Sequence, residues 1–105
     1  MEIKELHSGL QYRVLKAAIP AGQRMPTHFA SSDAFIVVAK GKAELIFSDR
    51  EVLLEKGISF LIPANKLHTL QVTEDFEAVI VLAGEGKIEF APVQAETLID
   101  NSFAG

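Results

Sequence analysis

Alternating and continuous apolar runs divide this sequence into short segments that are typical of β-strands. In residues 11–19, Leu15, Ala17 and Ile19 occupy every second position, as in a strand with one buried face. Apolar residues also recur here at every fourth position, so the same segment remains open to a helical interpretation. The Pro20-Ala21-Gly22 sequence predicts a turn after either element.

The next part of the chain predicts two strands joined by a reversal. Residues 35–39 are mostly β-branched or aromatic and apolar on both faces, which is typical of a strand between two layers. Residues 40–42, Lys-Gly-Lys, predict a tight reversal into a second strand over 43–47.

Later segments continue this pattern as far as residue 83, with polar turns that include Glu74-Asp75. Seven or more short strands without a clear long helix predict an all-β antiparallel sandwich or barrel, a single domain over residues 1–105. The tail predicts an edge strand over 87–92 and a short C-terminal helical turn within 94–103. The later strands are expected at 51–55, 58–62, 67–73 and 77–83.

Composition adds a prediction about assembly. The chain has 105 residues, of which 49% are apolar, and its mean hydropathy is +0.23. A domain of this size buries roughly two thirds of the surface that its unfolded chain exposes. The apolar surplus, notably in the doubly apolar runs 35–39 and 79–83, predicts a homodimer.

Other features exclude several classes of protein. The chain has no cysteine, which excludes disulfides and thiolate metal sites. Its net charge of −4 is spread along the sequence, so we expect no nucleic-acid partner. Apolar runs such as 34–39 are far shorter than the ~20 residues of a membrane-spanning helix, so we expect no membrane partner. The charged start, Met-Glu-Ile-Lys-Glu, is unlike a signal peptide, and we expect a cytoplasmic protein.

Two segments share one layout, a glycine followed by a spaced anchor and a histidine. Five residues separate Gly22 from His28; five separate Gly57 from Pro63, and His68 follows. This layout resembles the two motifs of the cupin superfamily, G-x5-H-x-H-x3-E-x6-G and G-x5-P-x-G-x2-H-x3-N. The resemblance covers residues 22–72, about half of the chain, and implies a cupin-like double-stranded β-helix, a jelly-roll barrel whose motif residues point inward. The matching positions are Gly22, His28, Gly41, Gly57, Pro63 and His68.

The resemblance also implies a metal site of three histidines and one carboxylate, which this sequence does not complete. Ala30 stands at the second histidine position and Ala34 at the glutamate position. Transition-metal sites usually use three or four protein ligands, so His28 and His68 alone would leave most of the shell to water. We therefore expect no cofactor. The second motif further departs at Asn65, in place of glycine, and at Val72, in place of asparagine.

No neighbouring polar residue replaces the missing ligands in the expected strand pattern. Asp33 is adjacent to Ala34, and alternation turns it to the opposite face of the strand. Glu44 and Gln71 alternate away from their inward neighbours, and Met25 offers only a thioether.

We therefore predict a non-catalytic cupin-like protein that binds a small molecule inside its barrel. His28 and His68 would supply the polar contacts, and aliphatic side chains the walls. Three alternatives remain open. In the first, His28 and His68 bind a divalent transition metal in an enzyme of the dioxygenase or isomerase type. In the second, the protein is a sensing or interaction module whose barrel is filled by its own side chains. In the third, the two histidines are purely structural, neutral and hydrogen-bonded. The predicted pocket residues are His28, Ala30, Ala34, Ile36, Leu45, His68 and Leu70.

Overall fold

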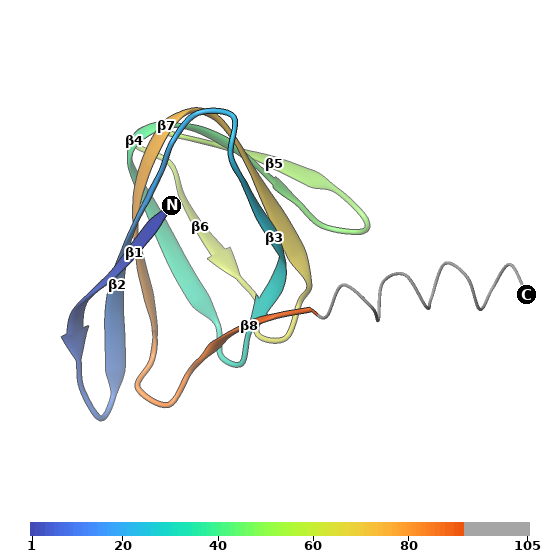
Figure 1. Ribbon diagram of the computed structural model, residues 1–105. Helices are drawn as coiled ribbons and strands as arrows, with labels where there is room; N and C mark the ends of the chain where they lie inside the picture. The colour runs from blue at the N-terminus through green and yellow to red at the C-terminus, as the bar shows by residue number, and fades with distance from the viewer. Residues whose placement is uncertain (92–105) are drawn as a thin grey trace, which may run out of the picture.

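The computed structural model describes residues 1–91, which form one curled antiparallel sheet (Figure 1). The all-β prediction is confirmed, and the helical interpretation of 11–19 is wrong, because that segment is a strand. No helix in the described part of the chain is long and apolar enough to cross a membrane. The helical turn predicted within 94–103 lies outside the described residues. The strands are β1 (Glu2–Ser8), β2 (Tyr12–Ile19), β3 (Arg24–Ala30), β4 (Ala34–Ile46), β5 (Glu51–Glu55), β6 (Ser59–Ile62), β7 (His68–Ala83) and β8 (Ile88–Phe90).

The two long strands, β4 and β7, hold the sheet together. They pair with each other from Ala34↔Leu82 to Ile46↔Thr69. The other edge of β7 pairs with β3 near its start and with β2 near its end, and the other edge of β4 pairs with β6 and then β5. The sheet therefore folds into two halves, β1-β2-β7-β4-β6 and β8-β3-β7-β4-β5, which face each other across the core (Figure 1).

The predicted reversal at 40–42 and the predicted turn at 74–75 are both wrong, because the chain bends there without turning back. Each pair of expected short strands is one long strand, and the register between β4 and β7 shifts at the bend. Gly41 has a φ of 82°, a conformation that favours glycine. Lys42 and Glu74 form an ion pair across the bend with an N–O distance of 3.6 Å. Polar residues and a glycine therefore mark the outside of a corner where both strands pass from one half to the other.

Alternation along the strands sorts the side chains between the core and the outer surface. In β2 and β4 the inward positions are buried, for example Leu15, Ile36 and Leu45. The run at 35–39 is apolar on both faces because its outward side chains are apolar as well as its inward ones, and these outward side chains remain exposed. These belong to a surface that we name the outer apolar patch, where neighbouring strands place exposed apolar side chains on one face: Tyr12 (49%), Phe35 (42%), Val37 (40%) and Leu61 (51%).

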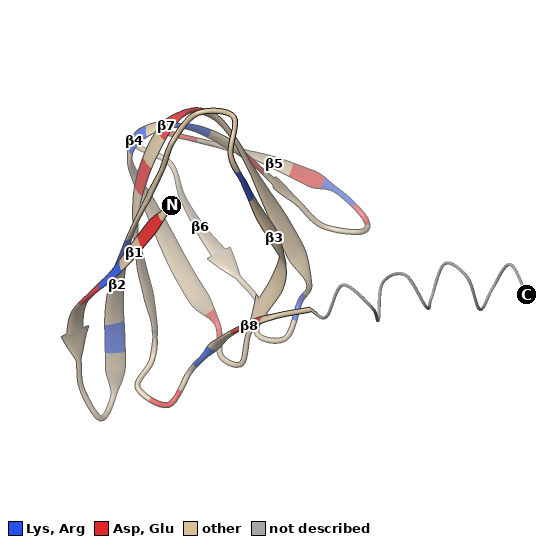
Figure 2. Ribbon diagram, in the orientation of Figure 1, with Lys and Arg blue, Asp and Glu red and all other residues tan. Residues whose placement is uncertain are grey.

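Charged residues gather mainly at bends and strand ends. Figure 2 shows that β6 and the parts of β4 and β7 beside it, residues 34–39 and 78–83, are free of them. At the corner of the sheet, Glu77 lies 3.4 Å from the Nζ atom of Lys16 and 4.0 Å from that of Lys40. The outer apolar patch is therefore bordered by ion pairs and not interrupted by them.

Candidate functional site

A tight turn delivers His68 to the interior at the start of β7. Asn65 adopts a φ of 63° in this turn, a left-handed conformation that asparagine tolerates better than most residues. The backbone N–H of Asn65 donates to the carbonyl of Ala30 at 2.7 Å, which ties the turn to the end of β3. The Pro63–Lys66 turn predicted from the sequence is confirmed, since the Lys66 N–H donates to the carbonyl of Pro63 at 3.4 Å.

His28 on β3 lies directly opposite His68 on β7 in the strand register. The two imidazole centroids are 4.2 Å apart with an interplanar angle of 67°, an edge-to-face contact. Both side chains are buried, with 6% and 5% of their surface exposed. Forty residues apart in sequence, the two histidines therefore form one pair inside the fold, as the motif resemblance predicts.

Each imidazole is oriented by a backbone carbonyl two residues earlier in the chain. His28 Nδ1 lies 2.7 Å from the Pro26 carbonyl oxygen, and His68 Nδ1 lies 2.8 Å from the Lys66 carbonyl oxygen. Burial lowers the pKa of His28 to about 4, with a smaller contribution from the neighbouring His68, although the bond to Pro26 opposes the shift. Burial also lowers the pKa of His68, against the effect of its bond to Lys66. Both rings are therefore neutral at neutral pH.

The histidine pair borders a small cavity between the two halves of the sheet, with a volume of about 50 Å³. Its walls are hydrocarbon apart from the two imidazoles and the thioether of Met25. The structure brings all seven predicted pocket residues to this cavity; that they contact a ligand remains a prediction. The seven are His28, Ala30, Ala34, Ile36, Leu45, His68 and Leu70.

Sequence reasoning missed the residues that close the cavity at the terminal strands. Ile3 of β1 and Ile88 of β8 line it. The sequence did not predict β1 as a strand, because this segment is charged and contributes a single apolar residue to the cavity. The edge strand expected at 87–92 exists as β8, and nothing local indicates that Ile88 faces the histidines. Other lining residues that the prediction omitted are Ala17, Ile19, Met25, Ile62, Phe76 and Ile80.

Residues that were considered as replacement ligands point elsewhere. Asp33 is exposed, and its Oδ1 accepts a hydrogen bond from the Ala64 N–H at 2.9 Å. The Gln71 side chain donates to the carbonyl of Gln23 at 3.3 Å, on the outside of the sheet. Within residues 1–91, no three side chains of His, Cys, Asp or Glu gather as a metal-binding group. Among the described lining residues, the possible metal donors are two imidazoles and a thioether, and this set does not fit a mononuclear site with three or four protein ligands.

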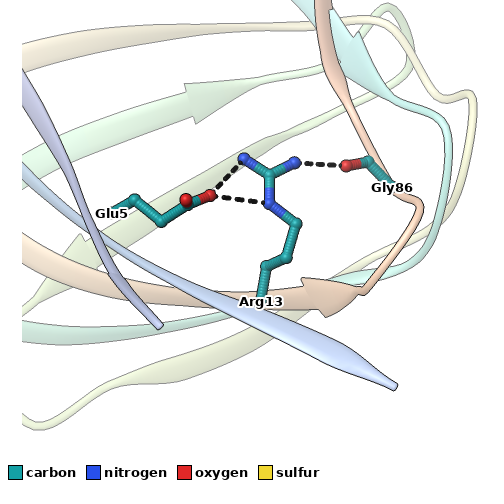
Figure 3. Close-up of polar contacts among 3 residues, drawn as sticks. All are labelled: Glu5, Arg13 and Gly86. Atoms are coloured by element: carbon teal, nitrogen blue, oxygen red, sulfur yellow. Dashed lines mark hydrogen bonds and ion pairs between the residues drawn. The ribbon is translucent and has the colours of Figure 1, made fainter. Parts of the chain in front are cut away.

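A larger, open groove lies beside the cavity between β1 and β8, with a volume of about 530 Å³. Ile3 and Ile88 line both spaces and therefore lie between them. Arg13 lies in this groove, where Nε and Nη2 donate to Glu5 at 2.9 and 2.8 Å and Nη1 donates to the Gly86 carbonyl (Figure 3). Arg13 thereby ties the β1–β2 hairpin to the loop that follows β7.

The sequence matches one protein family, and the fold is similar to several solved structures. A family model described as the cupin domain matches residues 15–84. An RmlC-like cupin family protein with a double-stranded β-helix fold from Methanocaldococcus jannaschii has a TM-score of 0.72 and 21% identity, covering 78% of each chain. A cupin superfamily protein from Desulfitobacterium hafniense DCB-2 has a TM-score of 0.73 and 16% identity, over 78% of this chain and 75% of that chain. KdgF from Halomonas sp. has a TM-score of 0.71 and 16% identity, over 79% and 77%. No curated protein matches the sequence.

Proposed function

Since this chain belongs to the cupin domain family, we propose that it binds a small molecule in the cavity between its sheet halves and does not transform it. The observation that supports this most directly is the contact between His28 and His68, at 4.2 Å between ring centroids, in an otherwise apolar cavity. A concave apolar space with a few convergent polar groups is the usual form of a ligand site.

The chemistry of the pair supports binding over catalysis. An effective general base has a pKa near the working pH, whereas burial lowers the pKa of His28 to about 4. Of the residues that the structure describes, no serine, threonine, lysine or carboxylate lines the cavity, so neither imidazole has among them a nucleophile to activate or an acid to orient it. The carbonyls of Pro26 and Lys66 orient the rings instead, and they are neutral acceptors.

A thermal-shift screen over small alcohols, ketones, acids and sugars tests the proposal. A ligand at 100 times its dissociation constant stabilises the folded state by about 2.7 kcal/mol, which is a shift of several degrees for a domain of this size. The matched variants are Ala34→Leu, which fills the cavity, and Ala39→Leu, which adds the same group on the exposed face of β4. We expect a ligand to stabilise the parent and the Ala39→Leu variant, and we expect it not to stabilise the Ala34→Leu variant. If no compound stabilises the parent, the barrel is a packed module without a ligand.

One observation favours metal binding as a second candidate. His28 and His68 are in ring contact with both Nδ1 atoms already bonded to backbone, which leaves both Nε2 atoms available to a shared ion. A substrate with two donor atoms would then have to complete the coordination shell. Elemental analysis of protein purified without a histidine tag tests this. A stoichiometric transition metal would favour a metal-dependent enzyme, whereas a metal-free protein would favour the proposed binding of a small molecule without catalysis.

A further inference from the structure

The two imidazole rings of the cavity carry their protons on the same nitrogen. The Nδ1 atoms of His28 and His68 lie 2.7 and 2.8 Å from the carbonyl oxygens of Pro26 and Lys66. A carbonyl oxygen can only accept a hydrogen bond, so each Nδ1 is the donor. In a neutral imidazole the other nitrogen is then an acceptor. Both Nε2 atoms therefore offer lone pairs, and burial keeps the rings neutral at neutral pH.

Both Nε2 atoms are reachable from the cavity. Within residues 1–91, the hydrogen bonds of His28 and His68 involve their Nδ1 atoms alone. No fully enclosed side-chain nitrogen or oxygen in the described part of the chain lacks a hydrogen-bond partner. The two Nε2 atoms, which have none, are therefore not fully enclosed, and the cavity is the space that both rings border.

In residues 1–91, no side-chain donor that could satisfy these lone pairs lines the cavity. Its other lining residues are aliphatic, Phe76 and Met25. Among residues 1–91, the buried side chain with a hydroxyl group is Thr69, and this hydroxyl is hydrogen-bonded to that of Thr27 at 2.9 Å. The site therefore presents two acceptors and no donor, in walls of hydrocarbon.

We propose, building on the proposed function, that the cavity selects an uncharged molecule with an apolar body and a hydroxyl group that donates to Nε2 of His28 or His68. A ketone or ether presents lone pairs to lone pairs and gains no hydrogen bond. A carboxylate or phosphate also presents lone pairs to the two Nε2 atoms, and in addition it brings a negative charge into an apolar space. An ammonium group brings a positive charge into a space that offers it no counter-ion. An alcohol satisfies the acceptors and leaves its hydrocarbon part against the walls.

The volume sets the size of the ligand group that enters. At about 50 Å³ the cavity is much smaller than the roughly 150 Å³ of an engineered cavity that holds benzene. It accommodates a group of about four non-hydrogen atoms. Such small ligands bind weakly, with dissociation constants of about 1 mM or more, so the test needs a method that detects weak binding.

Three compounds of the same size and shape separate the possibilities: 2-propanol, which donates, acetone, which only accepts, and acetate, which accepts and is charged. The intact ¹⁵N-labelled protein is titrated with each at pH 7, and the imidazole ¹⁵N resonances of His28 and His68 are followed by NMR. We expect 2-propanol to shift an Nε2 resonance saturably, with about five- to tenfold higher affinity than acetone or acetate, as for one hydrogen bond. The spectrum of the unliganded protein should show the proton on Nδ1 of both rings.

The outcomes separate the inference from the proposed function. Equal binding of acetone or acetate would overturn the donor preference and leave small-molecule binding intact. A proton on Nε2 of either ring in the unliganded protein would overturn the inference directly. If none of the three compounds perturbs either histidine, the cavity admits no ligand of this size, and the proposed function fails together with the inference.

Two variants locate the binding. Ala34→Leu fills the cavity and should abolish the response to 2-propanol, whereas Ala39→Leu, on the exposed face of the same strand, should retain it. A folded Ala34→Leu protein that still responds would place the binding elsewhere and contradict the inference. Should Ala34→Leu fail to fold, the comparison of the three compounds on the parent protein decides alone.

Discussion

Gly41 on β4 and Asp75 on β7 approach each other so closely that a Cβ atom at Gly41 would lie 1.9 Å from the Asp75 carbonyl oxygen. The obstacle is backbone, which cannot move aside as a flexible side chain does. At this corner the two long strands pass together from one half of the sheet to the other. The contact therefore controls whether β4 and β7 can remain paired along their whole length.

We predict that Gly41→Ala lowers the free energy of unfolding by about 3 kcal/mol or more, because it adds a backbone clash to an unfavourable positive φ. Gly22→Ala is the matched control, since Gly22 also has a positive φ, of 88°, but nothing within 4 Å of an added Cβ. It should cost only the left-handed penalty of about 1–2 kcal/mol. Urea unfolding measures both. Equal losses in the two variants would show that the corner tolerates a side chain.

The histidine pair predicts a loss of stability in mild acid. The pKa of His28 is about 4 in the folded protein against 6.5 when unfolded, so the unfolded chain binds more protons between these values. Stability is then fully present above about pH 6.5 and falls as the pH drops towards 4, by an amount on the order of 3 kcal/mol for His28. The pKa of His68 shifts in the same direction, and His68 is the other titratable group among the described residues that line the cavity.

Unfolding free energies at pH 7 and pH 5 provide the measurement. The difference between them should shrink in His28→Phe and remain unchanged in His7→Gln, because His7 is exposed on β1. A His28→Phe protein with the parent's full pH dependence would mean that other groups cause the acid sensitivity.

We propose that two copies of this chain associate through the outer apolar patch. Phe35 and Leu61 are neighbours in the register between β4 and β6, and both are about half exposed. A stable pair should bury more than ~1,000 Å² in total. Light scattering at tens of micromolar is expected to give the dimer mass for the parent and the monomer mass for Phe35→Lys. Leu53→Lys, at an exposed position on β5, should remain a dimer.

That control distinguishes a specific interface from general loss of hydrophobicity, since both variants replace an exposed apolar residue by lysine. A parent that is monomeric under these conditions contradicts the proposed dimer. Dissociation by both variants would place the interface elsewhere.

Restoring the two missing ligands should create a metal site. Ala30 and Ala34 both line the cavity that His28 and His68 share, so Ala30→His with Ala34→Glu would complete three imidazoles and a carboxylate. Calorimetric titration with Zn²⁺ is expected to show weak binding by the parent and at least about tenfold tighter binding by the double variant. Adding His28→Ala to the double variant should remove the gain. Tight stoichiometric binding by the parent, abolished by His28→Ala, would favour the metal-dependent enzyme instead.

The interior of the fold was largely predictable, because it depends on local spacing. Strand alternation and the glycine–histidine layout bring His28, His68 and five apolar neighbours to one cavity, as expected. The corner was not predictable, because Lys-Gly-Lys at 40–42 is equally suited to a hairpin and to an outward bend. The choice between them depends on pairing with distant residues, such as Lys42 with Glu74.

The residues that line the cavity from the terminal strands could not be predicted from the sequence for a related reason. Ile3 lines the cavity from a charged strand whose residues are all exposed, and Ile88 belongs to a strand of three residues. The apolar residues of β1 do not alternate, and β8 is too short to show a period. Their positions depend on the partner strands β2 and β3, which a local pattern does not specify.

The position of these two isoleucines has a kinetic consequence. β1 pairs with β2 and β8 with β3, each along a single edge, so the partition between cavity and groove comes from strands that are supported on one side only. Arg13 joins the two sides through Glu5 and the Gly86 carbonyl (Figure 3). A molecule that enters the cavity from the groove has to pass these two isoleucines, so its entry by this route depends on their moving apart. Its rate of association would level off as its concentration rises, at the frequency with which the protein itself opens.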